Sequence, residues 1–184
     1  APTKNSFNNL LKENISRKKI IVTGNTIVDS IKYIINEKLN KKKSRELCIF
    51  FERKYNFDVS LKFIFVTFHR RENQGNNILL FVRLIKNISS MFPEINIILP
   101  LHLNPKVKNI IAMHLTKIKN VYLVSHLSYV KSLFLIKQSQ FVISDSGGIQ
   151  EEVPSFHKRI IVLRKFTERV EGVKLKIAFL LNFD

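Results

Sequence analysis

Short apolar runs alternate along the chain with segments in which apolar residues recur every three or four positions. The runs predict strands buried on both faces of a sheet, and the recurring positions predict amphipathic helices. Their alternation predicts an α/β fold with a doubly wound parallel sheet and right-handed crossovers. The predicted strands are 19–23, 63–67, 95–99, 121–124, 141–144 and 160–163; the predicted helices are 27–39, 77–91, 105–114, 129–137 and one that opens near Gly148.

Residues 40–57 leave two interpretations open, because they are charged and only irregularly apolar. They form either an inserted helix or a linker. A chain of 184 residues can bury one sizeable core, so we expect one domain with a short extension. In sheets of the predicted kind, ligands bind outside the carboxyl ends of the strands.

Composition narrows the setting of the protein. No apolar run approaches the roughly 20 residues that cross a bilayer, so we expect no membrane partner. Cys48 is the single cysteine, and its apolar neighbours indicate a buried, reduced thiol, which favours a cytoplasmic location. The chain opens at Ala1 without a leader pattern, which indicates the middle of a longer protein.

The formal net charge of +17 raises the question of a polyanionic partner. The lysines are scattered, however, and only Lys41, Lys42 and Lys43 form a tight run beside Lys38. No RNA-binding or zinc-finger pattern accompanies them. We therefore favour compositional drift and expect no nucleic-acid partner, with a basic polyanion-binding protein as the non-enzymatic alternative.

The strongest candidate site is residues 144–152, which read Ser-Asp-Ser-Gly-Gly-Ile-Gln-Glu-Glu. A strand ends here and a helix begins, so free backbone N–H groups and the positive helix end face an anion. Gly147 and Gly148 let a diphosphate approach the main chain, and Ser146 can cap the helix while touching phosphate. Glu152 is spaced to accept hydrogen bonds from a ribose. An ordinary capped helix is the alternative.

Further polar groups follow three other predicted strands. His69 and Arg70 open a His-Arg-Arg-Glu-Asn segment that can move a proton and bind phosphate, and a surface ion-pair cluster is the alternative. His102 follows the next strand, and residues 167–169 (Thr-Glu-Arg) follow the last one. The remaining histidines have no such placement and are interpreted as incidental: His114, His126 and His157.

Taken in order, these motifs resemble the non-hydrolysing UDP-N-acetylglucosamine 2-epimerases, over nearly the whole chain. The matching segments are 1–3 (Ala-Pro-Thr), 22–26 (Val-Thr-Gly-Asn-Thr), 69–73 (His-Arg-Arg-Glu-Asn), 102–105 (His-Leu-Asn-Pro), 145–152 (Asp-Ser-Gly-Gly-Ile-Gln-Glu-Glu) and 167–169 (Thr-Glu-Arg).

The resemblance implies a Rossmann-like C-terminal domain of a GT-B fold, in which two such domains face each other across a cleft. Residues 1–40 would be the end of the N-terminal domain and an interdomain segment, and residues 41–184 the UDP-binding domain, incomplete at its C-terminus. It implies epimerisation of UDP-N-acetylglucosamine to UDP-N-acetylmannosamine by elimination and re-addition of UDP, without metal or cofactor, for cell-surface polysaccharide synthesis. A GT-B glycosyltransferase half is the alternative enzyme.

The resemblance also assigns roles to residues. Ser146, Gly147 and Gly148 would hold the diphosphate, Glu152 the ribose, Arg169 the substrate, and His69 would be catalytic. Arg70 and His102 match positions that contact a second, activating UDP-N-acetylglucosamine. The carboxylates that move the C2 proton would lie in the N-terminal half, so we expect an inactive fragment that needs that half, or a homodimer, as partner. Phe68 replaces a usual glycine, and Ser132 replaces an aromatic residue near the uracil.

Overall fold

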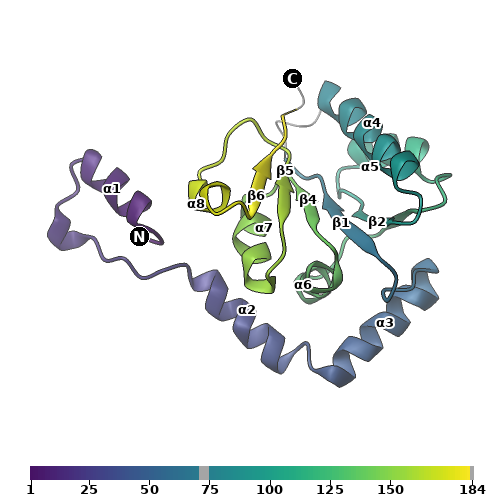
Figure 1. Cartoon of the computed structure of the whole chain (residues 1–184), viewed down its shortest axis with the longest axis horizontal. Helices are drawn as coiled ribbons and strands as arrows, with labels where there is room; N and C mark the ends of the chain where they lie inside the picture. Colours follow the sequence, from purple (N-terminus) through teal and green to yellow (C-terminus); the bar gives the residue numbers. More distant parts are fainter. Residues whose placement is uncertain (71–74, 183–184) are drawn as a thin grey trace.

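A six-stranded parallel sheet forms the centre of the protein in the computed structural model, which describes residues 1–70 and 75–182 (Figure 1). The strand order is β3-β2-β1-β4-β5-β6, so the chain starts in the middle and winds outward in both directions. The strands are β1 (Phe63–Thr67), β2 (Asn96–Pro100), β3 (Val121–Val124), β4 (Val142–Ser144), β5 (Ile160–Val162) and β6 (Ala178–Leu180). The predicted doubly wound α/β class is confirmed.

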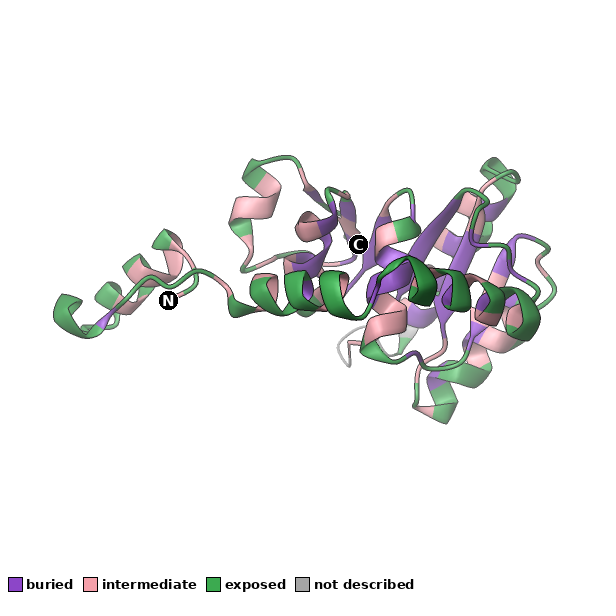
Figure 2. Ribbon diagram, turned by 90° about the horizontal axis from the view of Figure 1, so that it is seen from below, coloured by how far each residue is buried: buried purple, intermediate pink, exposed green. Residues whose placement is uncertain are grey.

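Helices cover both faces of the sheet, because successive strand residues point to opposite sides. In β1, Phe63 and Phe65 enter one apolar core, whereas Ile64 and Val66 enter the other. Figure 2 shows the strands buried between helices. The helices after β1 are α4 (Asn76–Met91), α5 (Pro105–Leu115), α6 (Tyr129–Gln138), α7 (Gly147–Glu152) and α8 (Val170–Lys174), with a 3₁₀ turn, η3 (Val153–Phe156), after α7.

An N-terminal arm precedes β1 and extends beyond the sheet (Figure 1). It comprises α1 (Lys4–Lys12), the 3₁₀ turn η1 (Arg17–Lys19), α2 (Thr26–Glu37) and α3 (Lys41–Tyr55). No residue of α1 is buried, whereas Ile31 of α2 and Phe51 of α3 are fully buried in the first core. Helices α2 and α3 therefore attach the arm to the domain by packing against its first core.

Residues 40–57, which the sequence leaves open, are mostly helix α3. The Asn40 side chain accepts a hydrogen bond from the backbone N–H of Lys43 at 2.9 Å, which starts the helix. Asn56 ends it in a left-handed conformation with φ of 51°. Cys48 on this helix is only partly buried, less than expected, and burial raises the pKa of its thiol.

The predicted strand at 19–23 is wrong. Residues 17–19 form the turn η1, and residues 20–25 are irregular. Ile21 is 72% exposed, because none of the described strands lies beside it to complete a sheet. Helix α8, strand β6 and helix α1 were not expected. Within the described residues, no helix is both long and apolar enough to cross a membrane.

Candidate functional site

The loops that follow β1 and β4 start side by side at the carboxyl edge of the sheet. Thr67 and Ser144, the last residues of these strands, are paired in register. Their buried hydroxyl groups are 2.7 Å apart and hydrogen-bonded. The His69 segment and the glycine bend are therefore neighbours in space, although Thr67 and Ser144 are 77 positions apart in the sequence.

Asp145 fixes the geometry between these two loops. Its side chain is fully buried, and its carboxylate accepts hydrogen bonds from the backbone N–H groups of His69, at 2.9 and 3.1 Å, and of Arg70, at 2.8 Å. A buried carboxylate is costly unless it is hydrogen-bonded in this way. The sequence places Asp145 in the motif but gives no sign of this positioning role.

The glycine bend starts helix α7 as predicted. Ser146 caps the helix, since its hydroxyl accepts a hydrogen bond from the backbone N–H of Ile149 at 3.5 Å. Gly148 is exposed and Gly147 partly exposed. Within the described chain, the N–H groups of both glycines have no acceptor, as is usual for the first turn of a helix. These amides are therefore available to an anion.

Arg169 lies against this bend. Its guanidinium carbon is 2.9 Å from the position that a Cβ atom on Gly147 would occupy. The guanidinium also forms ion pairs of 2.7 Å with Glu151 and with Glu168. The predicted substrate residue is thus next to the glycine amides, held there by two carboxylates. A hydrogen bond from the Arg164 side chain is the main reason why the pKa of Glu168 is lowered to about 2. A backbone hydrogen bond and the positive charges of Arg164 and Arg169 contribute to the same shift.

A second set of hydrogen bonds joins the loop after β5 to helix α7. The Thr167 hydroxyl donates to the Gln150 side-chain oxygen at 2.6 Å and accepts from the Arg169 backbone N–H at 3.1 Å. The Gln150 amide donates in turn to the backbone oxygen of Ser146 at 3.3 Å. Gln150 therefore positions both the bend and Arg169, a role that the sequence does not reveal.

Glu152 lies one turn into helix α7 and is 8% exposed. Burial raises the pKa of its carboxyl, and the negative charge of Glu151 adds to this, while a hydrogen bond from the Tyr129 phenol opposes it. Burial and the carboxylate of Glu152 raise the pKa of Tyr129 to about 12. A buried acceptor beside the bend, with a phenol next to it, suits hydroxyl groups of a sugar. Tyr129 is a site residue that the sequence did not reveal.

His69 is partly buried among other imidazoles. Burial lowers its pKa, the charges of His102 and His126 lower it further, and Asp145 partly opposes this. The His69 and His102 rings are 5.7 Å apart between centroids. His126 lies on the same rim, where a cavity of about 380 Å³ is bordered by His102 and His126. Arg71, Glu72 and Asn73 lie outside the described residues.

The N-terminal arm reaches the site through Asn25. Its side-chain amide donates to Glu151 at 2.8 Å, and its oxygen caps α2 by accepting from the Ile27 N–H at 3.1 Å. A cavity of about 390 Å³ opens beside it. Residues that line this cavity include Thr3, Ser6, Asn25, Glu151, Glu168 and Arg169.

Phe68 does not obstruct the site, although it replaces a usual glycine. Its ring is buried and stacks on Phe81 with centroids 4.2 Å apart and an interplanar angle of 15°. The side chain therefore enters the core under α4. Ser132 lies partly buried on α6.

Comparisons with known proteins agree with this geometry. A UDP-N-acetylglucosamine 2-epimerase from Campylobacter jejuni is 40% identical over 183 residues, covering 98% of this chain and 48% of the relative. The crystal structure of the Neisseria meningitidis enzyme bound to UDP-GlcNAc superimposes with a TM-score of 0.92 at 36% identity, over 100% of this chain and 49% of that one. The Methanocaldococcus jannaschii enzyme in complex with UDP-GlcNAc and UDP has a TM-score of 0.83 at 29% identity, over 100% and 50%.

The chain spans about half the length of the curated relatives it matches. Its sheet is the Rossmann-like unit of the GT-B-type fold that these epimerases share. The family model described as UDP-N-acetylglucosamine 2-epimerase matches residues 1–184. Order of motifs, fold and similarity thus lead to one assignment: this chain belongs to the UDP-N-acetylglucosamine 2-epimerase family, an isomerase family.

Proposed function

We propose that this chain is the UDP-holding half of a non-hydrolysing epimerase that interconverts UDP-N-acetylglucosamine and UDP-N-acetylmannosamine. The observation that supports this most is the pair of open amides at Gly147 and Gly148 beside the buried carboxylate of Glu152. Amides at a helix start bind phosphate oxygens, and a carboxylate accepts hydrogen bonds from ribose hydroxyls. The relatives whose structures contain UDP or UDP-GlcNAc have the same fold.

In this proposal each residue at the carboxyl edge of the sheet has its own role. Ser146, Gly147 and Gly148 bind the diphosphate, and Glu152 binds the ribose. Arg169 stabilises the negative charge on UDP when the bond between the sugar C1 and the phosphate oxygen breaks. That bond breaks while a proton leaves C2, giving a 2-acetamidoglucal. UDP then re-forms its bond to C1, and a proton is added to the opposite face of C2.

In the same proposal, His69 exchanges a proton at the departing phosphate. Burial keeps its imidazole neutral near pH 7, so it can accept a hydrogen bond or, once protonated, donate one. Arg70 and His102 would contact a second, activating UDP-N-acetylglucosamine. The carboxylates that move the C2 proton would come from an N-terminal half, as residues 1–40 would be the end of that half and its connection, and residues 41–184 the UDP-binding domain.

We further propose a cytoplasmic setting, a role in supplying polysaccharide synthesis, and pairing with a complementary N-terminal half or a second copy. The direct test is a calorimetric titration of this chain with UDP, compared with Glu152→Ala. The proposal expects saturable binding that weakens about tenfold in the variant, the loss of one charge-assisted hydrogen bond. Absence of UDP binding in the folded protein would refute it.

A further inference from the structure

A second cavity lies away from the glycine bend, at the corner where α2 meets α3 and both approach the start of α6. Its volume is about 540 Å³, within the range of small-molecule sites. Leu47 of α3 and Val130 of α6 form an apolar part of its wall. The remaining wall is strongly basic, with Lys38, Lys42 and Lys43 from the α2–α3 corner and Lys131 from α6.

The charges of this cavity are only partly neutralised. Four ammonium groups share it with two carboxylates, Glu37 and Glu46. Glu46 forms an ion pair with Lys43, with 2.9 Å between a carboxylate oxygen and the Nζ atom. Among the described residues, no ion pair engages Lys38 or Lys42. The cavity therefore retains excess positive charge.

The start of α6 adds donors to the same cavity. Ser128, the N-cap residue, lines it, and its hydroxyl makes no capping hydrogen bond. The Nζ atom of Lys131 is 3.6 Å from the centroid of the Phe50 ring, which holds that ammonium at the rim. Lysine ammonium groups, a free hydroxyl and a positive helix end together match the oxygens of phosphate.

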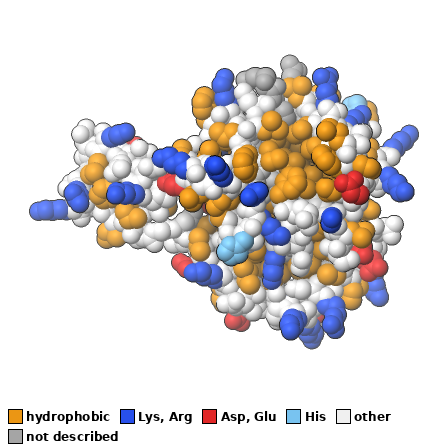
Figure 3. All heavy atoms as spheres, viewed as in Figure 1, with side chains coloured by type: hydrophobic (Ala, Val, Ile, Leu, Met, Phe, Trp, Pro, Cys, Tyr) orange, Lys and Arg blue, Asp and Glu red, His pale blue; other side chains and the backbone are white. Residues whose placement is uncertain are grey.

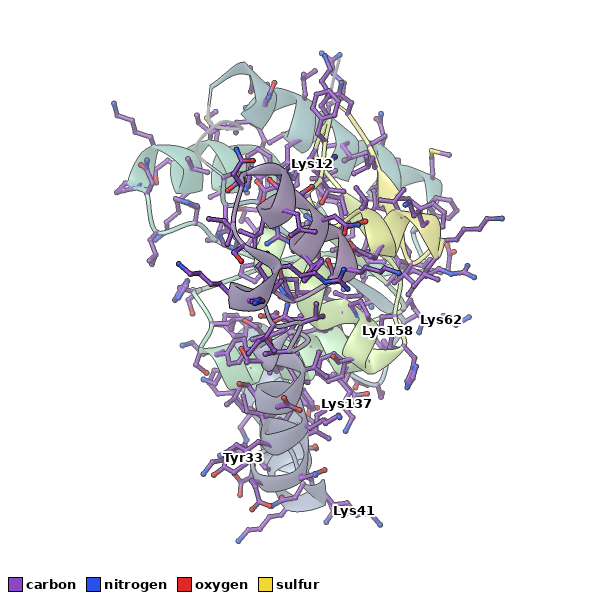
Figure 4. All side chains as sticks on the ribbon, turned by 90° about the vertical axis from the view of Figure 1, so that its left-hand side faces the viewer. Lys12, Tyr33, Lys41, Lys62, Lys137 and Lys158 are labelled. Carbon is purple, nitrogen blue, oxygen red and sulfur yellow. The ribbon has the colours of Figure 1, made fainter. Side chains whose placement is uncertain are left out.

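The shape of the cavity distinguishes a small ligand from a polymer. Figure 3 shows Lys and Arg side chains at the lower edge of the molecule, over this corner, and Figure 4 shows Lys41 projecting from its tip. A nucleic acid would use such exposed side chains along an open surface. Lys38 and Lys42 are exposed as well, but together with Lys131 they surround a hollow with an apolar part, which suits a compact phosphorylated molecule.

We propose that this cavity is a further binding site, for a small phosphate compound of the pyrophosphate or phosphate-ester class. It is separate from the glycine bend, and it shares one structural wall with the nucleotide site. Tyr129 interacts with Glu152, while its neighbours Ser128 and Val130 line the cavity. The two sites are therefore neighbours across the first turn of α6.

The test is a titration of the whole chain with inorganic pyrophosphate at constant ionic strength, followed by backbone amide NMR. The expected result is a saturable shift of the Val130 and Lys131 amides, in addition to shifts at the glycine bend. Lys42→Ala should lower the affinity measured at Val130 roughly tenfold, the loss of one charge-assisted hydrogen bond. Lys12→Ala, an exposed lysine of α1 labelled in Figure 4, should leave it unchanged.

Three outcomes overturn the proposal: no saturable shift at Val130, equal effects of the Lys42 and Lys12 substitutions, or binding only of long polyanions with a steep dependence on salt. Thermal unfolding of each variant shows that it is folded. The same samples titrated with UDP keep the two sites apart. Glu152→Ala should weaken UDP alone, so failure of the proposed nucleotide site leaves a different signature from failure of the lysine-lined cavity.

Discussion

The buried carboxylate of Asp145 accepts a hydrogen bond of 2.9 Å from the backbone N–H of His69. This contact joins residues 76 positions apart and ties the loop after β1 to the strand that leads into the glycine bend. The distance between the imidazole and the bend is therefore set by main-chain and buried atoms, which move little.

Replacing Asp145 with Ala should destabilise the fold by about 2–3 kcal/mol, because two partly buried N–H groups lose their charged acceptor. Urea denaturation at pH 7 measures this. Glu94→Ala, an exposed carboxylate without a described ion pair, is the matched control and should change stability by less than about 0.5 kcal/mol. Similar values for the two variants would contradict the positioning role of Asp145.

Gly148→Ala should separate folding from binding. An added Cβ would lie 3.8 Å from the Ser146 hydroxyl and 4.0 Å from a Glu152 oxygen, which are ordinary contacts. Alanine also suits a helix better than glycine, so the stability should stay the same or rise by up to about 1 kcal/mol. UDP affinity should fall, because the methyl group stands where the diphosphate approaches the main chain. If the UDP affinity of Gly148→Ala is unchanged, the diphosphate does not approach the main chain closely at this residue.

Glu152→Gln should stabilise the free protein at pH 7. The folded-state pKa of Glu152 is raised above its ordinary 4.5, chiefly by burial, so the protonated form is favoured in the folded protein. That contribution is present below the unfolded pKa and is lost as pH rises through the folded pKa. The stability gained by the variant should therefore be greatest near neutrality and shrink toward pH 4. Thermal melts across this range would show a constant difference if burial had no such effect.

His69 should titrate below its ordinary pKa of 6.5, because burial disfavours the imidazolium. The folded state therefore resists a proton that the unfolded chain accepts, so stability is lost as pH falls from 6.5 toward the folded pKa. UDP should raise the pKa of His69, since the diphosphate adds negative charge nearby. NMR of the imidazole protons measures the pKa of His69 without UDP and its change when UDP binds.

His157 is the control in that experiment. It lines a cavity with residues that precede the strands, such as Lys62 and Gln140, at the opposite edge of the sheet. Its proton shifts at fixed pH should not respond to UDP. If the His69 titration midpoint stays where it was when UDP saturates the protein, the imidazole does not face the phosphate.

Much of the fold follows from the sequence because buried parallel strands are continuous apolar runs. The predicted bounds 63–67 and 121–124 are those of β1 and β3. The run at 19–23 looks the same, yet it has no neighbouring strand, and pairing is not a local property. Strand β6 was missed because it is three residues long and only Ala178 in it is buried. Short edge strands carry too few positions for an alternation to show.

The candidate site was predictable where residues follow strands directly. The sequence places His69, His102 and the glycine bend after three strands, and the fold gathers these positions on one rim. Residues whose role depends on contacts between distant segments were missed. Asn25 meets Glu151 across 126 positions, and Tyr129 meets Glu152 from another helix. No local spacing encodes such contacts.

The nucleotide proposal depends on binding of the UDP diphosphate by the Gly147 and Gly148 amides. Backbone amide NMR during a UDP titration measures this binding at each residue. We expect these two amides to show the largest shifts in the described chain, the shifts to saturate, and saturation to require higher UDP concentrations in Glu152→Ala. Saturable UDP binding that leaves both glycine amides unmoved, or no binding at all by the folded protein, would contradict it.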